Sequence, residues 1–163
     1  MTARSLRRVV WSMAGVLVLG AGAAACGGSG GGGGAASAPK ADYVRKVSAL
    51  CRESAAERRT LVPTSGSATT QGLVDALQRS VAVDEQLEQR ISALTPPKGD
   101  EQSIRGLLDL MKQSDQVALR LVVTIQHNDV KSFNVLYDQF NSLGAQVAAA
   151  ANRYGLTDCT TKQ

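Results

Sequence analysis

The sequence predicts an all-α fold: an antiparallel, up-down-up-down four-helix bundle that follows a signal peptide and a disordered glycine-rich linker. Apolar residues recur at alternating steps of three and four from residue 42 onward, which is the period of amphipathic helices. Aromatic residues make up only 4% of the chain and no proline follows Pro97, whereas a β-sandwich would need more aromatic residues and frequent turn signals. Four apolar stripes joined by short connections are most simply buried by antiparallel neighbours.

The first 25 residues have the pattern of an export signal. Basic residues precede an apolar run of about 17 residues, near the lower limit for spanning a bilayer. With small residues directly before Cys26, the pattern resembles a bacterial lipoprotein signal, in which this cysteine becomes the lipid-bearing first residue. We therefore expect residues 1–25 to be removed and Cys26 to hold the mature protein by lipid on the extracytoplasmic face of the cell membrane. The basic residues are Arg4, Arg7 and Arg8.

Some features of the signal leave alternatives open. Ala23 stands three residues before Cys26, where such signals usually have leucine, and Ala23-x-Ala25 would also suit an ordinary signal peptidase that releases the chain. Arg7-Arg8 would suit twin-arginine export, although the flanking residues match that signal poorly. Gly-Gly-Ser directly after Cys26 and the number of cysteines favour lipidation.

Charge and length argue against nucleic-acid binding and for one domain. The chain has 18 Lys+Arg and 14 Asp+Glu, a formal charge of +4, but three positive charges precede Cys26 and leave +1 for the mature part. Nucleic-acid binding needs a clustered basic face, which this balance does not favour. Residues 26–40 are too rich in glycine to fold and predict a flexible tether with a reach of about 20 Å. Residues 41–163 then suffice for one domain with a single core.

Prolines define the ends of the first two predicted helices. The first, 42–62, ends before Pro63, and a polar loop follows it. The second, 71–94, ends at Thr95-Pro96-Pro97, because proline lacks an N–H and disfavours helical geometry in the residue before it. The apolar stripe of the second helix leaves Asp75, Asp84, Glu88 and Arg90 largely off its face.

Turn residues define the ends of the other two helices. The third, 101–127, follows Gly99-Asp100-Glu101, which we interpret as a turn and an N-cap. Asn128 suits a left-handed terminal residue, and Asp129 suits the cap of the fourth helix, 130–154. Gly155-Leu156 then predicts a Schellman stop. The fourth stripe consists of Phe133, Leu136, Tyr137, Phe140, Leu143, Gly144, Val147, Ala151 and Tyr154.

The three cysteines support both the anchor and the bundle. If Cys26 is consumed as a thioether, Cys51 and Cys159 remain as one pair, which suits an exported protein. In an up-down-up-down bundle the end of the last helix lies beside the start of the first. We therefore expect a disulfide between Cys51 and Cys159 that joins these two helices.

Three motifs resemble those of small actinobacterial exported lipoproteins, a group of uncharacterised helical-bundle proteins. These often read Tyr-Val-x-Lys-x-x-x-Leu-Cys early, Leu-Thr-Pro-Pro-x-Gly-Asp-Glu in the middle and Tyr-Gly-Leu-x-x-Cys near the end. The matching residues here are Tyr43 to Cys51, Leu94 to Glu101 and Tyr154 to Cys159. The resemblance implies a helical envelope domain with one disulfide, and it implies no reaction. Asn128 stands where relatives commonly have glycine.

We find no catalytic or metal-binding constellation in the sequence, and we expect no cofactor. His127 is the only histidine, and its place at a helix C-terminus favours a structural role. Asp84, Asp115 and Ser114 fall on or near helix stripes, where paired carboxylates would serve acid–base chemistry or bind a cation. We expect them instead at solvated stripe edges, with Arg58 close enough to pair with one of them.

The function we predict is that of a lipid-anchored, non-enzymatic envelope protein whose helical domain binds or scaffolds a partner. The alternative is a carrier of a small apolar ligand held between the helices, where Gly144, Ala148 and Ala151 would leave room. An enzyme is the third possibility, and convergence of Asp84 and Asp115 in a pocket would favour it. The sequence leaves the partner, the ligand and the oligomeric state open.

Overall fold

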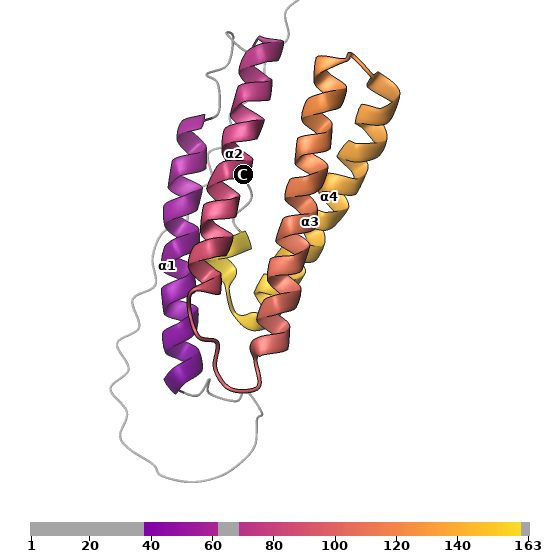
Figure 1. Cartoon of the computed structure of the whole chain (residues 1–163). Coiled ribbons are helices and arrows are strands. Elements are labelled where there is room, and N and C mark those ends of the chain that lie inside the picture. The colour runs from indigo at the N-terminus through magenta and orange to yellow at the C-terminus, as the bar shows by residue number, and fades with distance from the viewer. Residues whose placement is uncertain (1–37, 62–68, 161–163) are drawn as a thin grey trace, which may run out of the picture. The chain divides into compact units, whose positions relative to one another are not determined.

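The computed structural model describes residues 38–61 and 69–160, and it confirms the all-α four-helix arrangement. The signal, Cys26 and most of the glycine-rich tether lie outside the described residues. In Figure 1, α1 and α3 run upward while α2 and α4 run downward, so the up-down-up-down order is confirmed. The helices are α1 (Ala38–Leu61), α2 (Thr70–Ser92), α3 (Glu101–Gln126) and α4 (Val130–Tyr154), followed by the short 3-10 helix η1 (Thr157–Thr160).

The first helix begins earlier than the sequence predicted. α1 starts at Ala38, four residues before the expected start at residue 42, so the last three residues assigned to the tether are helical. Pro39 lies in the first turn, where its missing N–H removes no intrahelical hydrogen bond and its fixed φ suits the helix. Proline was therefore compatible with a helix at this position.

The corner residues act largely as expected. Asn128 has φ of 53°, and the Asp129 carboxylate accepts a hydrogen bond of 3.1 Å from the backbone N–H of Ser132. Gly155 has φ of 94°, and the N–H of Leu156 donates to the carbonyl of Ala151, which is the Schellman bond. Together these contacts fix the direction in which the chain enters and leaves α4.

One predicted cap is not formed. Asp100 occupies the N-cap position of α3, but its side chain makes no capping hydrogen bond. It instead accepts a hydrogen bond of 2.8 Å from the Tyr154 hydroxyl, and its Oδ2 lies 3.3 Å from Lys40 Nζ. Glu101 reaches back to accept from the N–H of Gly99 at 2.8 Å. The tertiary partners at the end of the bundle have thus replaced the local cap.

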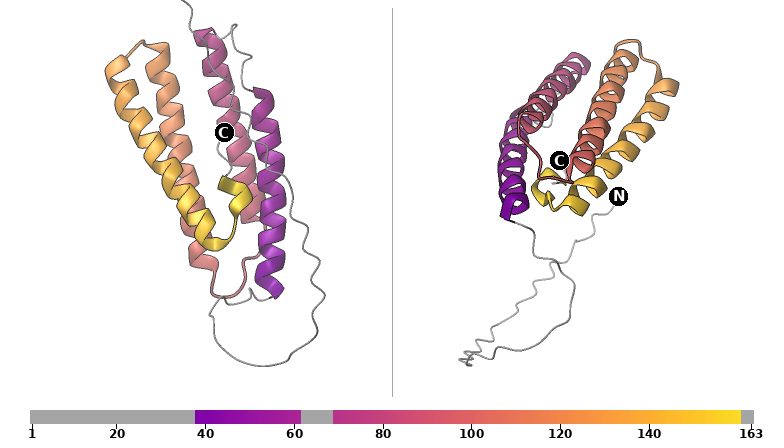
Figure 2. Two further views of the ribbon diagram at one scale, coloured as in Figure 1. Left: turned by 180° about the vertical axis from the view of Figure 1, so that it is seen from behind. Right: turned by 60° about the horizontal axis from the view of Figure 1, so that its bottom comes forward.

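The helices pack in chain order as two antiparallel pairs. α1 packs on α2, α2 on α3 and α3 on α4, while η1 lies between α1 and the end of α4. Both views in Figure 2 show η1 turning from the end of α4 toward α1. The Tyr43 and Tyr154 rings meet edge to face with centroids 6.1 Å apart. The end of the last helix therefore lies beside the start of the first, as predicted.

The expected disulfide closes this arrangement. Cys51 in α1 is bonded to Cys159 in η1, with their Cα atoms 5.0 Å apart and a sequence separation of 108. Cys51 belongs to the larger of two core clusters, which gathers buried residues from all four helices around the fully buried Leu156. The second cluster joins α3 and α4 alone through Val117, Leu121, Leu136 and Leu143.

The fourth apolar stripe is less buried than predicted. Tyr137 is 48% exposed and stacks on Phe133 with ring centroids 5.8 Å apart. Gly144 is also exposed. The stripe was correct in its period, but α4 contacts only α3 closely along most of its length, so part of the stripe has no helix to cover it.

Candidate binding cleft

A cleft of about 690 Å³ runs between the α1–α2 pair and the α3–α4 pair. All four helices and η1 contribute to its lining, which is mainly apolar, and its volume lies within the range of small-molecule sites in proteins. In Figure 1 α4 comes near α1 at the end where α2 leads into α3 and moves away from it toward the other end, while α2 and α3 stay side by side. The apolar lining includes Leu77, Val81, Ile91, Leu107, Met111, Ala118, Phe140 and Val147.

Small residues on α4 leave this cleft open. Gly144, Ala145 and Ala148 line it, and a Cβ added at Gly144 would meet nothing within 4 Å. Two of the three small residues expected to make room, Gly144 and Ala148, are therefore at the cleft. The third, Ala151, is not at the cleft. It is fully buried in the larger core cluster, at the end of the bundle that holds the disulfide, which we call the closed end.

Polar side chains form a group within the apolar cleft. Arg58 of α1 donates a hydrogen bond to the Asp84 carboxylate of α2, and the two side chains are only 18% and 21% exposed. Burial raises the pKa of Asp84, while the Arg58 guanidinium opposes that shift. Pairing of Arg58 with one of the predicted acids is thus confirmed, although the pair lies in the cleft and not at a solvated edge.

Asp115 and Glu88 form a pair of acidic side chains beside this ion pair. Asp115 of α3 lines the cleft, and Glu88 of α2 is only 6% exposed. Burial, followed by the nearby Asp84 and Glu88 carboxylates, raises the pKa of Asp115 to about 8. Burial also raises the pKa of Glu88, to which Asp115 is hydrogen-bonded. At neutral pH Asp115 therefore keeps its proton and donates it to Glu88, because two ionised carboxylates cannot share this contact.

The solvated placement expected for these acids is wrong. Asp84, Ser114 and Asp115 all line the cleft, and Glu88, which the helix stripe seemed to leave outside, is buried. The missed signal was spacing: Val81, Asp84, Glu88 and Ile91 follow steps of three, four and three, so the two acids continue the apolar stripe. We had expected both acids at the surface only because their side chains are charged.

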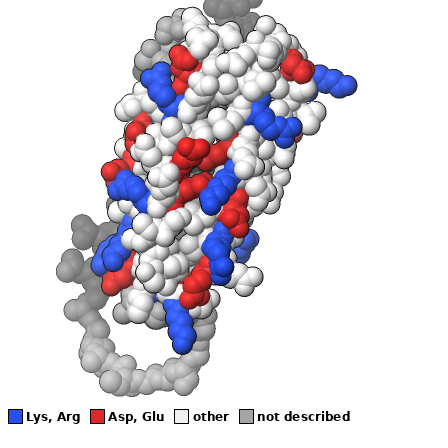
Figure 3. Space-filling view, in the orientation of Figure 1, with Lys and Arg blue, Asp and Glu red and all other residues white. Residues whose placement is uncertain are grey.

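Both cysteines of the disulfide also line the cleft, near η1. His127 is exposed at the C-terminal end of α3, outside the cleft lining. Figure 3 shows acidic side chains gathered midway along the face between α2 and α3, with basic side chains next to them. Acidic side chains thus gather where α2 meets α3, and further charged side chains are spread over the rest of this face.

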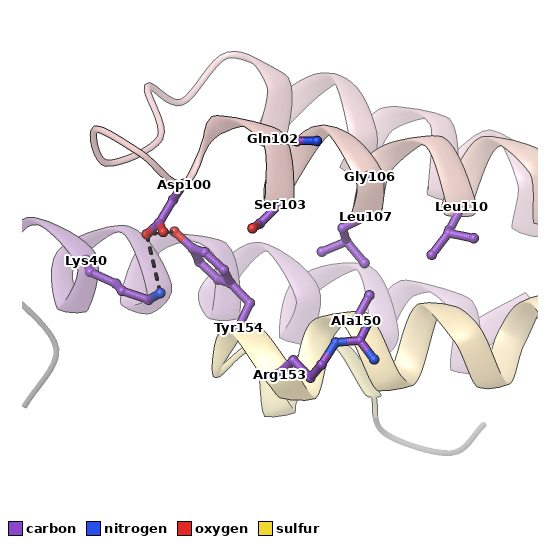
Figure 4. Close-up of a pocket in the computed structure, with 10 residues that line it drawn as sticks. All are labelled: Lys40, Asp100, Gln102, Ser103, Gly106, Leu107, Leu110, Ala150, Arg153 and Tyr154. Atoms are coloured by element: carbon purple, nitrogen blue, oxygen red, sulfur yellow. Dashed lines mark hydrogen bonds and ion pairs between the residues drawn. The ribbon is translucent and has the colours of Figure 1, made fainter. Parts of the chain in front are cut away.

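A smaller pocket of about 460 Å³ lies at the end of the bundle where α1 and α3 begin and α4 ends. Figure 4 shows Lys40 and Tyr154 both directed at Asp100, and the Lys40 ammonium lies 4.2 Å from the centre of the Tyr154 ring. Burial, with Asp100 as hydrogen-bond acceptor, raises the pKa of the Tyr154 hydroxyl. These three residues satisfy one another, so we assign them the role of joining three helices.

Other classes of site are absent from the described part of the chain. No helix in residues 38–61 or 69–160 combines the length and apolar character needed to cross a membrane. The same two ranges contain no group of three or more histidine, cysteine, aspartate or glutamate residues placed to hold a metal ion. Comparison of the chain with protein-family models, with curated proteins and with solved structures finds no match.

Proposed function

We propose that the protein is a lipid-anchored, non-catalytic binding protein that holds a small, largely apolar molecule between its two helix pairs. The observation that carries this proposal is the cleft itself: about 690 Å³ with a mainly apolar lining drawn from every helix. A bundle selected only for stability would fill such a space, because each unfilled methyl-sized volume costs about 1 kcal/mol. Gly144 and Ala148 keep the space open where larger apolar residues would close it.

The anchor in this proposal rests on the sequence before the described residues. The basic start, the apolar run and the alanines before Cys26 favour export and lipidation. A tethered domain with an apolar cleft would act as a carrier at the outer face of the cell membrane. Replacing Cys26 with alanine should move the protein from the membrane fraction to the soluble fraction, and unchanged partitioning would reject the anchor.

Binding in the cleft is testable with an apolar fluorescent probe, N-phenyl-1-naphthylamine, whose emission rises when it leaves water. Gly144→Leu should fill the cleft and weaken probe binding by on the order of tenfold or more, because the added side chain occupies the ligand's volume. Gly106→Leu is the matched control: it is also a mid-helix glycine whose added Cβ meets nothing within 4 Å, but it lines the smaller pocket. Equal binding by both variants and the wild type would reject the cleft as the site.

A second candidate function is docking of another envelope protein, which the exposed apolar residues near the α3–α4 corner favour. Val123, Val130 and Tyr137 are 51%, 69% and 48% exposed. Crosslinking in intact cells followed by recovery of the tagged protein tests this candidate. A partner that is captured by the wild type, and lost when these three residues are replaced by serine, would support it.

A further inference from the structure

We propose that the cleft selects a cationic amphiphile, whose apolar chain lies against α3 and α4 and whose charged head lies beside Glu88 and Asp115. The inference rests on the proposed function, namely that the cleft binds a small molecule, and it names the chemistry of that molecule. Three steps carry it: the charge around the cleft, the buried oxygens without donors, and the proton held by Asp115.

The charges that influence the Asp115–Glu88 pair leave an excess of negative charge. With Asp115 protonated, two positive and three negative groups remain, which is one net negative charge; the groups are Arg58, Lys112, Asp84, Glu85 and Glu88. The residues of α4 and η1 that line the cleft carry no titratable group, because Cys159 is held in the disulfide. A cationic head would therefore be attracted and an anionic head repelled, and both effects are strengthened by the partial burial of the site.

Two buried oxygen atoms lack a donor in the described structure. Glu88 Oε1 and Asp115 Oδ2 are both inaccessible to solvent and have no hydrogen-bond partner. Buried carboxylate oxygens without partners are costly, so a ligand that brings positive charge to them would relieve that cost. Because Glu88 is 6% exposed while Asp115 lines the cleft, the head group would reach Asp115 directly and Glu88 behind it.

Arg58 does not convert the cleft into an anion site. Its Nε is a buried donor without an acceptor, which a ligand hydroxyl would satisfy. Its guanidinium, however, is already hydrogen-bonded to the Asp84 carboxylate. An anionic head beside Arg58 would thus meet a neutralised cation on one side and further carboxylates on the other, so the net interaction stays unfavourable.

A permanent cation would also displace the proton of Asp115. Positive charge beside a carboxyl favours its ionised form, so binding converts the acid to a carboxylate and passes its proton to the buffer. The pKa of about 8 places this proton on Asp115 in the free protein at pH 7. Binding of a cation at pH 7 should therefore release up to one proton, and the release should disappear near pH 10, where Asp115 is ionised beforehand.

The test uses three amphiphiles with the same ten-carbon chain, each below its micelle concentration. Decyltrimethylammonium is a cation without a titratable proton, 1-decanol is neutral and decanoate is an anion. We expect the cation to bind on the order of tenfold more tightly than the alcohol, and decanoate to bind more weakly than both. Calorimetric titration with the cation in two buffers of different ionisation enthalpy measures the proton released.

Asp115→Asn keeps the shape of the neutral acid and removes its proton, so the variant separates charge from packing. We expect the preference for the cation over the alcohol to fall, because the variant cannot gain the negative charge that Asp115 gains on binding, and we expect proton release to vanish. Asp109→Asn is the control, because Asp109 is exposed on the same helix. Circular dichroism confirms that both variants are folded.

The outcomes distinguish this inference from the proposed function. If all three amphiphiles bind with similar affinity and Gly144→Leu weakens them all, the cleft binds ligands but the cationic preference is wrong. Cation binding without proton release, or with release unchanged in Asp115→Asn, would overturn the placement of the head group. If none of the three amphiphiles nor the fluorescent probe binds, both proposals fail.

Discussion

Asp115 lies near three other acidic groups, Asp84, Glu85 and Glu88, which make the electrostatic potential at its carboxyl more negative. Its carboxyl therefore holds a proton at a pH where an exposed aspartate has lost it, and it donates this proton to the Glu88 carboxylate, whose Oε1 still has no partner. The protonation of Asp115 therefore affects both the stability of the fold and the binding of a cationic ligand. The same carboxyl that would release a proton to a cationic ligand also makes the folded domain less stable as the pH rises.

We predict that Asp115→Asn removes much of that loss of stability. The pKa of Asp115 is raised from 3.8 to about 8 on folding, so between these values the native chain holds a proton that the unfolded chain has released. The free energy of unfolding should then fall by about 1.4 kcal/mol per pH unit across this window from this group alone. Below the window both states are protonated and above it both are ionised, so no slope remains there.

Urea unfolding followed by circular dichroism at about pH 5 and pH 8 checks this prediction. The asparagine variant should gain stability over the wild type as the pH rises, while Asp109→Asn should follow the wild type. A smaller slope should persist in Asp115→Asn, because burial also raises the pKa of Asp84 and Glu88. Parallel pH profiles of the wild type and the asparagine variant would show that Asp115 titrates normally.

Sequence reasoning found three of the residues at this site but not their environment. Asp84, Asp115 and Arg58 were identified from their spacing, and a pair between Arg58 and one of the candidate residues was predicted without saying which. Glu88 was missed because its charge suggested the surface, although its spacing places it on the stripe; whether a neighbouring helix covers that part of the stripe cannot be read from a single sequence. Its burial depends on how closely α2 approaches α3, which is a property of the assembled bundle.

At the scale of elements, the helix ends were the most predictable features. Gly155 and Asn128 were identified as left-handed positions, and both have positive φ. The N-cap at Asp100 was not formed, because Lys40 and the Tyr154 hydroxyl compete for its carboxylate from α1 and α4. Local capping rules therefore hold where a helix end is exposed, and they fail where distant residues supply stronger partners.

We predict that Gly155→Ala and Gly106→Ala change stability in opposite directions. Gly155 has φ of 94°, so an alanine there should reduce the free energy of unfolding by about 1–2 kcal/mol. Gly106 lies within α3 and its added Cβ would meet nothing within 4 Å, so alanine should raise stability by about 0.5–1 kcal/mol. Thermal unfolding of the two variants beside the wild type measures both effects. Stabilisation by Gly155→Ala would show that the left-handed stop does not persist in solution.

At the scale of the whole domain, the sequence predicted the number, order and direction of the helices because each has one apolar stripe and clear ends. It did not predict the cleft. Helical periodicity predicts which residues are buried. The angle between the two helix pairs depends instead on the sizes of the side chains at the contact between the pairs. Bulky residues such as Tyr43, Ile91 and Leu156 fill the closed end, whereas Gly144 and Ala148 leave space farther along α4.

The Cys51–Cys159 bridge holds the closed end of this arrangement together. It joins α1 to η1 across 108 residues, where α1 packs against η1 and not along α4. In the chain-entropy account, a loop of this length stabilises the folded state by about 4–5 kcal/mol relative to the open chain. That is a large part of the stability of an ordinary domain, which is about 5–15 kcal/mol.

We predict that the double variant Cys51→Ala, Cys159→Ala loses about 4–5 kcal/mol of stability and also binds the apolar probe more weakly. The second effect is expected because Cys159 and Thr160 line the cleft, so freeing η1 from α1 alters one of its walls. Cys26→Ala is the control, since it keeps the bridge and should unfold at the same urea concentration as the wild type. A double variant with unchanged stability and unchanged probe binding would mean that core packing around Leu156 alone holds η1 against α1. If the double variant is less stable but still binds the probe at low temperature, where it is folded, the disulfide stabilises the fold without shaping the cleft.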